Sequence, residues 1–403
     1  MTLLAEPAQF APDSHAKAAT LASRAAEVDL QALSAALAAT SAVHDAEASF
    51  PHANFALLQR HGLLALTVAE ADGGAGAGLQ RAREVIAAVS RGDPATALVL
   101  TMQYLQTRAL SHPGNGWPEA LRRQVLHSVV HDGALLNALR VEPELGTPAR
   151  GGLPATVAQR CAEGWRVSGH KLYSTGVEGL SWLVVWGRSD ETPVRTGAFL
   201  VPRQAPGVRI VKTWDSLGQR ASGSHDVLLE QVLIPASHAL ELREPADWSR
   251  APDAEQQHWM HVLLGALYDA IALNARDWLI HFLRTRAPAS LGAPLATLPR
   301  AQEALGEIEL LLQANRLQLD AAARDGDAGH PWSPADSGLL KTAVTRNAIE
   351  VVERALKLTG NHGMARANPL ERYHRDVLCG RIHTPQEDSA CIAAGRAALQ
   401  AAS

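Results

Sequence analysis

The chain has 403 residues, of which 47% are hydrophobic and 19% are charged, and its formal net charge is -4. A chain of this length can bury a large core, so we expect two or three packed layers of secondary structure. The mildly acidic balance, without a basic block, argues against a nucleic-acid-binding protein. The three cysteines, Cys161, Cys379 and Cys391, have neither zinc-like spacing nor a disulfide framework. They predict a reducing compartment and no structural metal.

The first part of the chain, residues 1–133, is predicted to be an N-terminal helical domain. Residues 14–48 are rich in Ala and Leu, and residues 78–92 repeat apolar side chains three and four positions apart. Residues 1–20 lack the basic-then-apolar order of a signal peptide, and no window of 18 residues is wholly apolar. We therefore expect a cytoplasmic protein without a membrane span.

The composition changes at residue 134, and residues 134–240 are predicted to be a β domain. Short runs such as "GWRVSGHKLYSTG" and "SWLVVWGRS" are rich in β-branched and aromatic residues, and Gly and Pro separate them. This pattern predicts a barrel or sandwich with mostly antiparallel pairing.

Long helical patterns return in the last part of the chain, residues 241–403. Residues 254–286 contain no proline, and two further helical stretches follow at 299–326 and 333–360. Ser333 is a candidate N-cap, and Gly360 is a candidate helix stop. These lengths favour a C-terminal four-helix bundle, so the predicted fold class is α+β.

Four short stretches, in this order and across this change of secondary structure, resemble the acyl-CoA dehydrogenase superfamily. "RVEPELGTP" (140–148) is similar to the family's T-E-P-x-x-G-S-D segment, and "GHKLYSTG" (169–176) to its G-x-K-x-W-I-T-N segment. "WDSLGQRASGSHDVLLEQVLIP" (214–235) is similar to L-G-x-R-x-S…V-P, and "LTGNHG…RYHRD" (358–376) to G-G-x-G…R-x-x-R-D. The resemblance extends over residues 15–400.

This resemblance implies FAD bound between the β domain and the bundle, in a homotetramer or homodimer. Tyr173 stands where the family usually has a flavin-stacking Trp, and a phenol ring can also cover a flavin face. Thr175 matches the hydroxyl residue that contacts flavin N5, and Thr147 matches the Ser of the first motif. As the electron acceptor of such an enzyme, the resemblance implies an electron-transfer flavoprotein.

The resemblance also assigns candidate contacts to the remainder of the cofactor. Gly360 and Gly363 match glycines that let the backbone approach the cofactor, although "GNHG" replaces the doubled glycine. Either Arg284 or Arg286 could bind the pyrophosphate of a neighbouring subunit, because a planar guanidinium suits phosphate. In the "RYHRD" stretch (372–376), we expect the adjacent arginine and aspartate to form an ion pair that braces the site.

The catalytic base that the family needs is missing from its usual position. Dehydrogenation of an acyl thioester requires a carboxylate near Cα, and Thr384 stands in the place of that glutamate. The Thr384 N–H could still polarise a thioester carbonyl. Some family members carry the base ten residues before a glycine on the first bundle helix, and counting back from Gly265 gives Glu255. Gln256 stands where an Arg usually follows that glutamate.

A second interpretation is oxygen chemistry. One branch of the superfamily consists of two-component flavin monooxygenases, which take reduced flavin, FMN included, from a flavin reductase. Their matching stretch often reads His-Asp-Pro, which His383-Thr384-Pro385 resembles, and Asn137 could be the branch's site asparagine. Histidine suits proton delivery, but Thr replaces Asp, and Gly380 stands in place of a second site histidine. A third interpretation is a non-catalytic flavin- or acyl-carrier-binding protein. The substrate would be an acyl thioester or another small apolar molecule.

Overall fold

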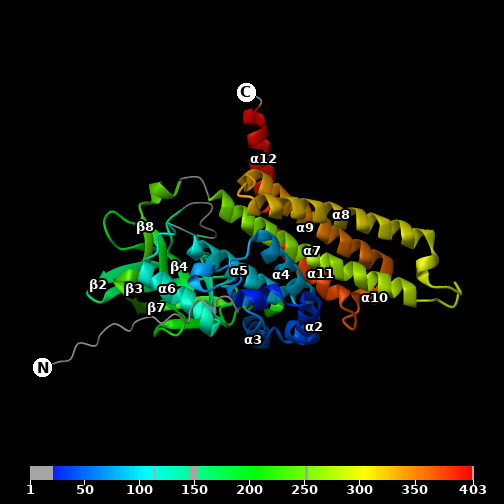
Figure 1. Ribbon diagram of the computed structural model, residues 1–403, viewed down its shortest axis with the longest axis horizontal. Helices are drawn as coiled ribbons and strands as arrows, with labels where there is room; N and C mark the ends of the chain where they lie inside the picture. The colour runs from blue at the N-terminus through cyan, green and yellow to red at the C-terminus, as the bar shows by residue number, and fades with distance from the viewer. Residues whose placement is uncertain (1–20, 113, 146–151, 250–252, 402–403) are drawn as a thin grey trace.

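The computed structural model describes residues 21–112, 114–145, 152–249 and 253–401. A helical N-terminal part leads into a β domain, and a bundle of long helices follows (Figure 1). This arrangement confirms the predicted α+β class with a central β domain between two helical parts. One apolar core runs through all three parts and includes Leu58, Trp165 and Leu267, each with at most 1% of its surface exposed.

The N-terminal helices begin where side chains can cap them. Asp29 accepts hydrogen bonds from two backbone N–H groups at the start of α2, and Asp93 accepts from the Thr96 N–H at the start of α5, just after Pro94. The N-terminus of α4 is capped from a distant helix by Asp327, whose carboxylate accepts from the N–H groups of Leu79 and Gln80. The helices are α2 (Leu30–Glu47), α3 (His52–Arg60), α4 (Leu79–Gly92), α5 (Pro94–Ser111) and α6 (Glu119–His127).

The β domain is one eight-stranded sheet in the order β6-β7-β3-β2-β4-β5-β8, with β1 paired to β4. Most neighbours are antiparallel, whereas β1 and β2 each run parallel to β4. The last strand continues past the boundary predicted at residue 240. The strands are β1 (Leu135–Leu139), β2 (Val157–Cys161), β3 (Gly164–Lys171), β4 (Leu180–Ser189), β5 (Thr196–Pro202), β6 (Val208–Val211), β7 (Asp226–Ile234) and β8 (Ala239–Arg243).

A buried ion pair lies inside this sheet. The Lys171 ammonium at the end of β3 is 2.6 Å from the Glu142 carboxylate, and both side chains are at most 1% exposed. Glu142 also accepts hydrogen bonds from the backbone N–H groups of Ala155 and Thr156. Since every charge in this cluster is paired, burial of the two ions is tolerated.

The C-terminal bundle is built on α7 and α9, which are packed against each other (Figure 1). Ser333 caps α9 and Gly360 ends it with a φ of 53°, as the sequence predicted. After α11 the chain turns sharply, and α12 projects away from the body of the molecule. The helices are α7 (Ala254–Thr285), α8 (Pro299–Asp327), α9 (Pro334–Thr359), α10 (Asn361–Met364), α11 (Leu370–Leu378) and α12 (Glu387–Ala401).

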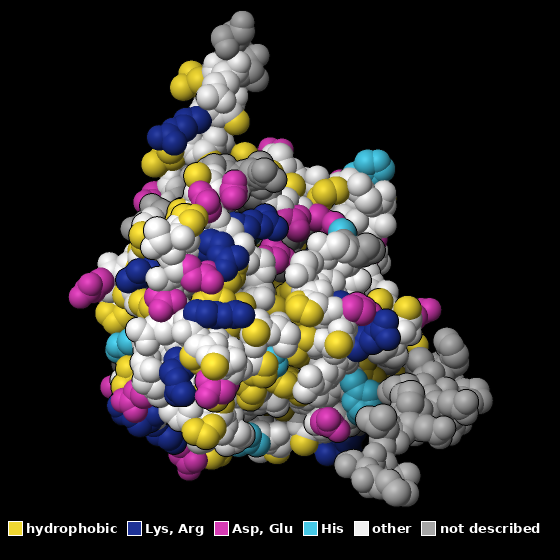
Figure 2. All heavy atoms as spheres, turned by 90° about the vertical axis from the view of Figure 1, so that its left-hand side faces the viewer, with side chains coloured by type: hydrophobic (Ala, Val, Ile, Leu, Met, Phe, Trp, Pro, Cys, Tyr) yellow, Lys and Arg dark blue, Asp and Glu magenta, His cyan; other side chains and the backbone are white. Residues whose placement is uncertain are grey.

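The surface carries interspersed charges. Figure 2 views the molecule from the end where the β domain lies. Lys, Arg, Asp and Glu side chains are mixed over this face. Among the described residues, no helix is both long enough and apolar enough to cross a lipid bilayer.

Candidate functional site

An exposed aromatic ring follows β3, where the second family-like motif ends. Tyr173 has a φ of 52°, which is unusual for a bulky residue, and 62% of its surface is exposed. Its ring lies edge-on to Trp214, with the ring centroids 6.4 Å apart. A large aromatic held outward in a strained backbone offers a flat surface for a planar ligand.

Next to this ring, three hydroxyl groups form a chain that ends at Thr175. Ser222 and Ser224, both buried, have their Oγ atoms 2.8 Å apart. Ser224 then donates to Thr175 Oγ1 at 3.1 Å, and the Thr175 carbonyl accepts from Asn137 Nδ2 at 3.0 Å. Because Thr175 Oγ1 already accepts this hydrogen bond, its own O–H remains available to donate to another group, such as a ligand.

The β domain meets the bundle just beyond these serines. The backbone N–H of Gln219 donates to Asp376 Oδ1 at 2.6 Å, and Arg375 donates to the Leu217 carbonyl. The expected ion pair between Arg375 and Asp376 is wrong, because Arg375 instead pairs with Asp45 and Glu371. Burial raises the pKa of Asp376 to about 7.

His383 and Thr384 follow the short turn after α11. The His383 ring lies 5.8 Å from the Tyr268 ring, centroid to centroid, and its buried Nε2 atom has no hydrogen-bond partner among the residues that the structure describes. Burial, together with the nearby positive charge of Lys341, lowers the pKa of His383 to about 4, so the imidazole is neutral at pH 7. Thr384 is exposed. This turn therefore carries the neutral imidazole of His383 next to the exposed Thr384.

Glu255 lies in the first turn of α7, apart from His383. Its carboxylate forms an ion pair with Arg108, and Arg108 also donates to the Gln256 side chain. The Glu255 side chain is 40% exposed. Tyr268, which contacts His383, comes thirteen residues later, which is roughly 20 Å along the helix. The Glu255 carboxylate, which was predicted to be the base, is therefore engaged in an ion pair with Arg108.

The other predicted cofactor residues lie elsewhere. Arg284 and Arg286 are exposed at the C-terminal end of α7. Gly360 and Gly363 flank the start of α10, and a Cβ on Gly363 would come within 2.3 Å of its neighbour Thr359. Local packing explains Gly363, and its role in cofactor binding stays a prediction, as do those of Gly360 and both arginines. Thr147 lies outside the described residues.

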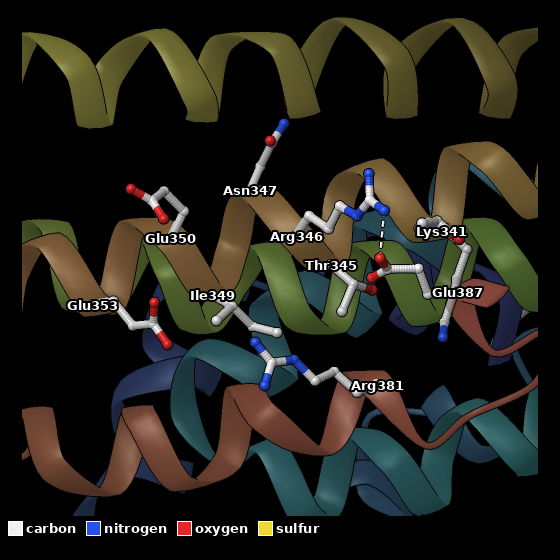
Figure 3. Close-up of a pocket in the computed structure, with 10 residues that line it drawn as sticks. Lys341, Thr345, Arg346, Asn347, Ile349, Glu350, Glu353, Arg381 and Glu387 are labelled. Carbon is white, nitrogen blue, oxygen red and sulfur yellow. Dashed lines mark hydrogen bonds and ion pairs between the residues drawn. The ribbon is translucent and has the colours of Figure 1, made fainter. Parts of the chain in front are cut away.

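A groove of about 320 Å³ lies along α9, and Lys341, Arg346 and Arg381 are among the residues that line it. Figure 3 shows its charged lining, with Arg346 paired to Glu387 and Arg381 reaching in from the opposite side. Glu353, at one end, lies 3.8 Å from His374. Neither Thr175 nor His383 lines this groove.

Sequence reasoning missed two parts of the site. Ser224 is 49 positions from Thr175, so only the fold brings their hydroxyls together. Lys341 was passed over as one residue of a helical pattern, yet it is 2% exposed and holds the turn that carries His383. A lysine on the buried face of an amphipathic helix was the available signal.

The three-part fold, a β domain between two helical parts, places an exposed aromatic ring and a chain of hydroxyl groups at the edge of the β domain. Sequence profiles for the N-terminal, middle and C-terminal domains of acyl-CoA dehydrogenase match residues 30–130, 140–232 and 263–398. The chain belongs to the acyl-CoA dehydrogenase family. It is therefore an oxidoreductase of a family that uses flavin.

Three relatives show the range of this family. "Putative acyl-CoA dehydrogenase YdbM" of Bacillus subtilis is 32% identical over 88% of this chain and 91% of its own length. The amino sugar nitrososynthase DnmZ of Streptomyces peucetius is 30% identical over 87% and 86%. The solved structure of KijD3 with FMN and a dTDP-linked amino sugar is 26% identical, has a TM-score of 0.79, and covers 98% of this chain and 95% of its own.

Proposed function

We propose that this protein oxygenates a small organic substrate and takes its reduced flavin from a separate flavin reductase. One observation carries this proposal: neither predicted base position holds a free carboxylate. Position 384 is a threonine, and Glu255 is paired with Arg108. Removal of an α-proton needs an available base, whereas oxygen chemistry needs electrons, a proton source and a dry pocket.

The residues around the proposed flavin site suit that chemistry. Bound reduced flavin supplies the electrons that activate oxygen. Tyr173 offers a ring for one face of the cofactor, and the Thr175 O–H is directed to donate to it. His383 is neutral with an unpaired Nε2, so it can move a proton at that atom. The likeness to KijD3, solved with FMN, supports FMN as the flavin, with FAD as the family's alternative.

The second candidate is the dehydrogenation of an acyl thioester. It is favoured by the ten-residue spacing from Glu255 to Gly265 and by the 32% identity with YdbM. In this reaction Glu255 would take the Cα proton while a hydride leaves Cβ for the bound FAD, and an electron-transfer flavoprotein would reoxidise it. Before it could act as the base, the Glu255 carboxylate would have to break its ion pair with Arg108. The non-catalytic interpretation stays open only if neither reaction occurs.

Two mixing experiments separate these functions. Protein loaded with FMN is reduced anaerobically and mixed with oxygenated buffer, and the return of oxidised-flavin absorbance is followed. An oxygenase should delay this return at least about tenfold relative to free reduced FMN. Separately, the oxidised protein loaded with FAD receives butyryl-CoA and octanoyl-CoA without oxygen. Bleaching by either thioester would establish the dehydrogenase instead.

His383 provides the matched variant for this test. His383→Gln removes the proposed proton carrier and should shorten the delay towards that of free flavin. His330→Gln removes an exposed histidine in the loop after α8 and should leave the delay unchanged. Reoxidation as fast as that of free flavin in the unmodified protein would refute the oxygenase proposal.

A further inference from the structure

One buried histidine lies between the two segments that carry Tyr173 and Trp214. His225 is 6% exposed and directly precedes β7. Its backbone carbonyl accepts a hydrogen bond at 3.1 Å from the N–H of Ser174, the residue after Tyr173. Its side chain binds the other segment, because Nδ1 accepts from the backbone N–H groups of Thr213, at 3.1 Å, and Trp214, at 3.0 Å. His225 therefore holds both of the segments that carry these aromatic rings.

The two N–H donors determine where the His225 ring carries its proton. A ring nitrogen that accepts hydrogen bonds has no proton of its own, so the ring is neutral and its proton is on Nε2. That nitrogen faces Glu178, with 3.4 Å between Nε2 and Oε2. Lys212 pairs with the other oxygen of the same carboxylate, at 3.2 Å. A proton on Nδ1 would displace both backbone donors, so the contact with the 213–214 segment depends on this tautomer.

The side chain of His225 binds the chain where the sheet no longer can. The ladder between β6 and β7 ends at the pair Val211 and Asp226. The N–H groups of Thr213 and Trp214 lie beyond it and need other acceptors. Asp226 helps to close this end, because its Oδ1 accepts from the Thr213 hydroxyl at 2.7 Å. The imidazole therefore extends the connection between the two strands past the end of their ladder.

The two anchored rings form a corner. Their planes are 80° apart and their centroids are separated by 6.4 Å. Trp214 is half-buried, and its Nε1 donates to the Gln219 carbonyl at 3.0 Å, whereas Tyr173 is the more exposed ring. Two rings at this angle can contact both the face and the edge of one planar ligand. Because the corner is held by the protein, a ligand does not have to order it on binding.

We propose that His225 is a positioning residue that fixes Trp214 beside Tyr173, and so makes Trp214 a second aromatic contact of the flavin ring. This inference rests on the proposed function for the presence of a flavin at Tyr173. His225 acts through its hydrogen bonds to the backbone and does not touch the flavin. Its loss would keep both aromatic residues but would free the angle between their rings.

The tautomer can be observed without flavin. In protein labelled with ¹⁵N in its histidine rings, the signals that disappear in His225→Asn belong to His225. At neutral pH these signals should be those of a neutral ring with Nδ1 unprotonated and Nε2 protonated. A His225 ring with a proton on Nδ1 would overturn the proposal.

Two variants separate the roles of the two ring nitrogens. In His225→Asn the amide oxygen can replace Nδ1 as the acceptor, whereas the longer side chain of His225→Gln reaches towards Glu178 and leaves both N–H groups without an acceptor. Hydrogen exchange of the Thr213 and Trp214 amides should be at least about tenfold faster in His225→Gln, and within about threefold of the unmodified protein in His225→Asn. Equal exchange in all three proteins would overturn the anchoring role.

The contact with the flavin has its own readout. The dissociation constant of FMN, measured by fluorescence titration, should rise at least about fivefold in His225→Gln and less than about twofold in His225→Asn. An unchanged constant in His225→Gln would overturn the role of the corner in flavin binding. His330→Gln, at an exposed position in the loop after α8, is the control and should change neither exchange nor affinity.

A further variant covers the case in which circular dichroism shows that His225→Gln does not fold. Trp214→Leu removes the second ring and leaves His225 in place, and should raise the dissociation constant of FMN at least about threefold. An unchanged constant would refute the contact between Trp214 and the flavin. If these affinities change as expected but the reduced protein reoxidises as fast as free flavin, the oxygenase proposal fails while the positioning role of His225 stands.

Discussion

The direction of one hydroxyl decides what Thr175 can do. Ser224 donates to its oxygen, and Asn137 donates to its carbonyl, so both acceptor groups of the residue are engaged from inside the protein. The O–H of Thr175 is left to donate to a further acceptor. The sequence placed Thr175 in a candidate flavin site, but a one-dimensional pattern carries no information on hydroxyl direction.

Removing this donor should weaken flavin binding. Thr175→Val keeps the shape of the side chain and deletes one hydrogen bond worth about 1 kcal/mol, so the dissociation constant of FMN should rise about fivefold. Ser224→Ala should produce a smaller rise, because it only frees the direction of the Thr175 hydroxyl. Fluorescence titration measures both constants. Ser168→Ala, at a half-buried position of β3 where the hydroxyl is bound by Gln231, is the control, and an unchanged constant in Thr175→Val would contradict the assigned role.

At the scale of the element, β3 depends on a buried charge. Lys171 ends this strand, and Glu142 lies in the segment after β1, so their ion pair joins two parts of the chain beside the backbone hydrogen bond from the Leu172 N–H to the Val141 carbonyl. The sequence motifs named both stretches as family-like. The motifs could not predict that the Lys171 and Glu142 charges are buried together, because burial depends on the packing of the whole sheet.

Breaking this pair should be costly. Lys171→Met leaves the Glu142 carboxylate buried without its cation, which typically destabilises a protein by about 3–5 kcal/mol. Lys212→Met removes a lysine that is 77% exposed and pairs with Glu178 at the surface, and should cost no more than about 1 kcal/mol. Urea denaturation gives both values. Equal midpoints for the two variants would show that the buried pair adds nothing to stability.

At the scale of the whole molecule, Asp376 links the bundle to the β domain by accepting from the Gln219 N–H. Burial raises its pKa to about 7 in the folded chain, whereas an unfolded aspartate titrates near pH 4. Between these values the folded state holds a proton that the unfolded state has lost. The contribution of Asp376 to stability therefore falls as the pH rises from about 4 to about 7.

Asp376→Asn should remove this dependence. Relative to the unmodified protein, the variant should gain stability by up to about 1.4 kcal/mol for each pH unit in that window. The pKa values of His383 and His261 are lowered to about 4, so these two residues make stability rise with pH. Both the variant and the unmodified protein contain them, so their contributions cancel in the stability difference. Thermal unfolding from pH 4.5 to pH 7.5 provides the measurement. A pH-independent difference would show that the carboxyl is ionised throughout, and Asp388→Asn, at an exposed position, controls for loss of an aspartate.

The sequence by itself determined the order of the three parts, the bounds of the long helices and the family, because propensity, periodicity, caps and short motifs are local. Ser333 and Gly360 mark helix ends by their own chemistry. Only the tertiary structure decided which charged groups meet. Arg375 pairs with Asp45, which is 330 positions away, and not with the adjacent Asp376. The strength of a charge–charge interaction depends on the distance between the groups and on their burial. Both are determined by how distant segments of the chain pack against each other, and not by the local sequence.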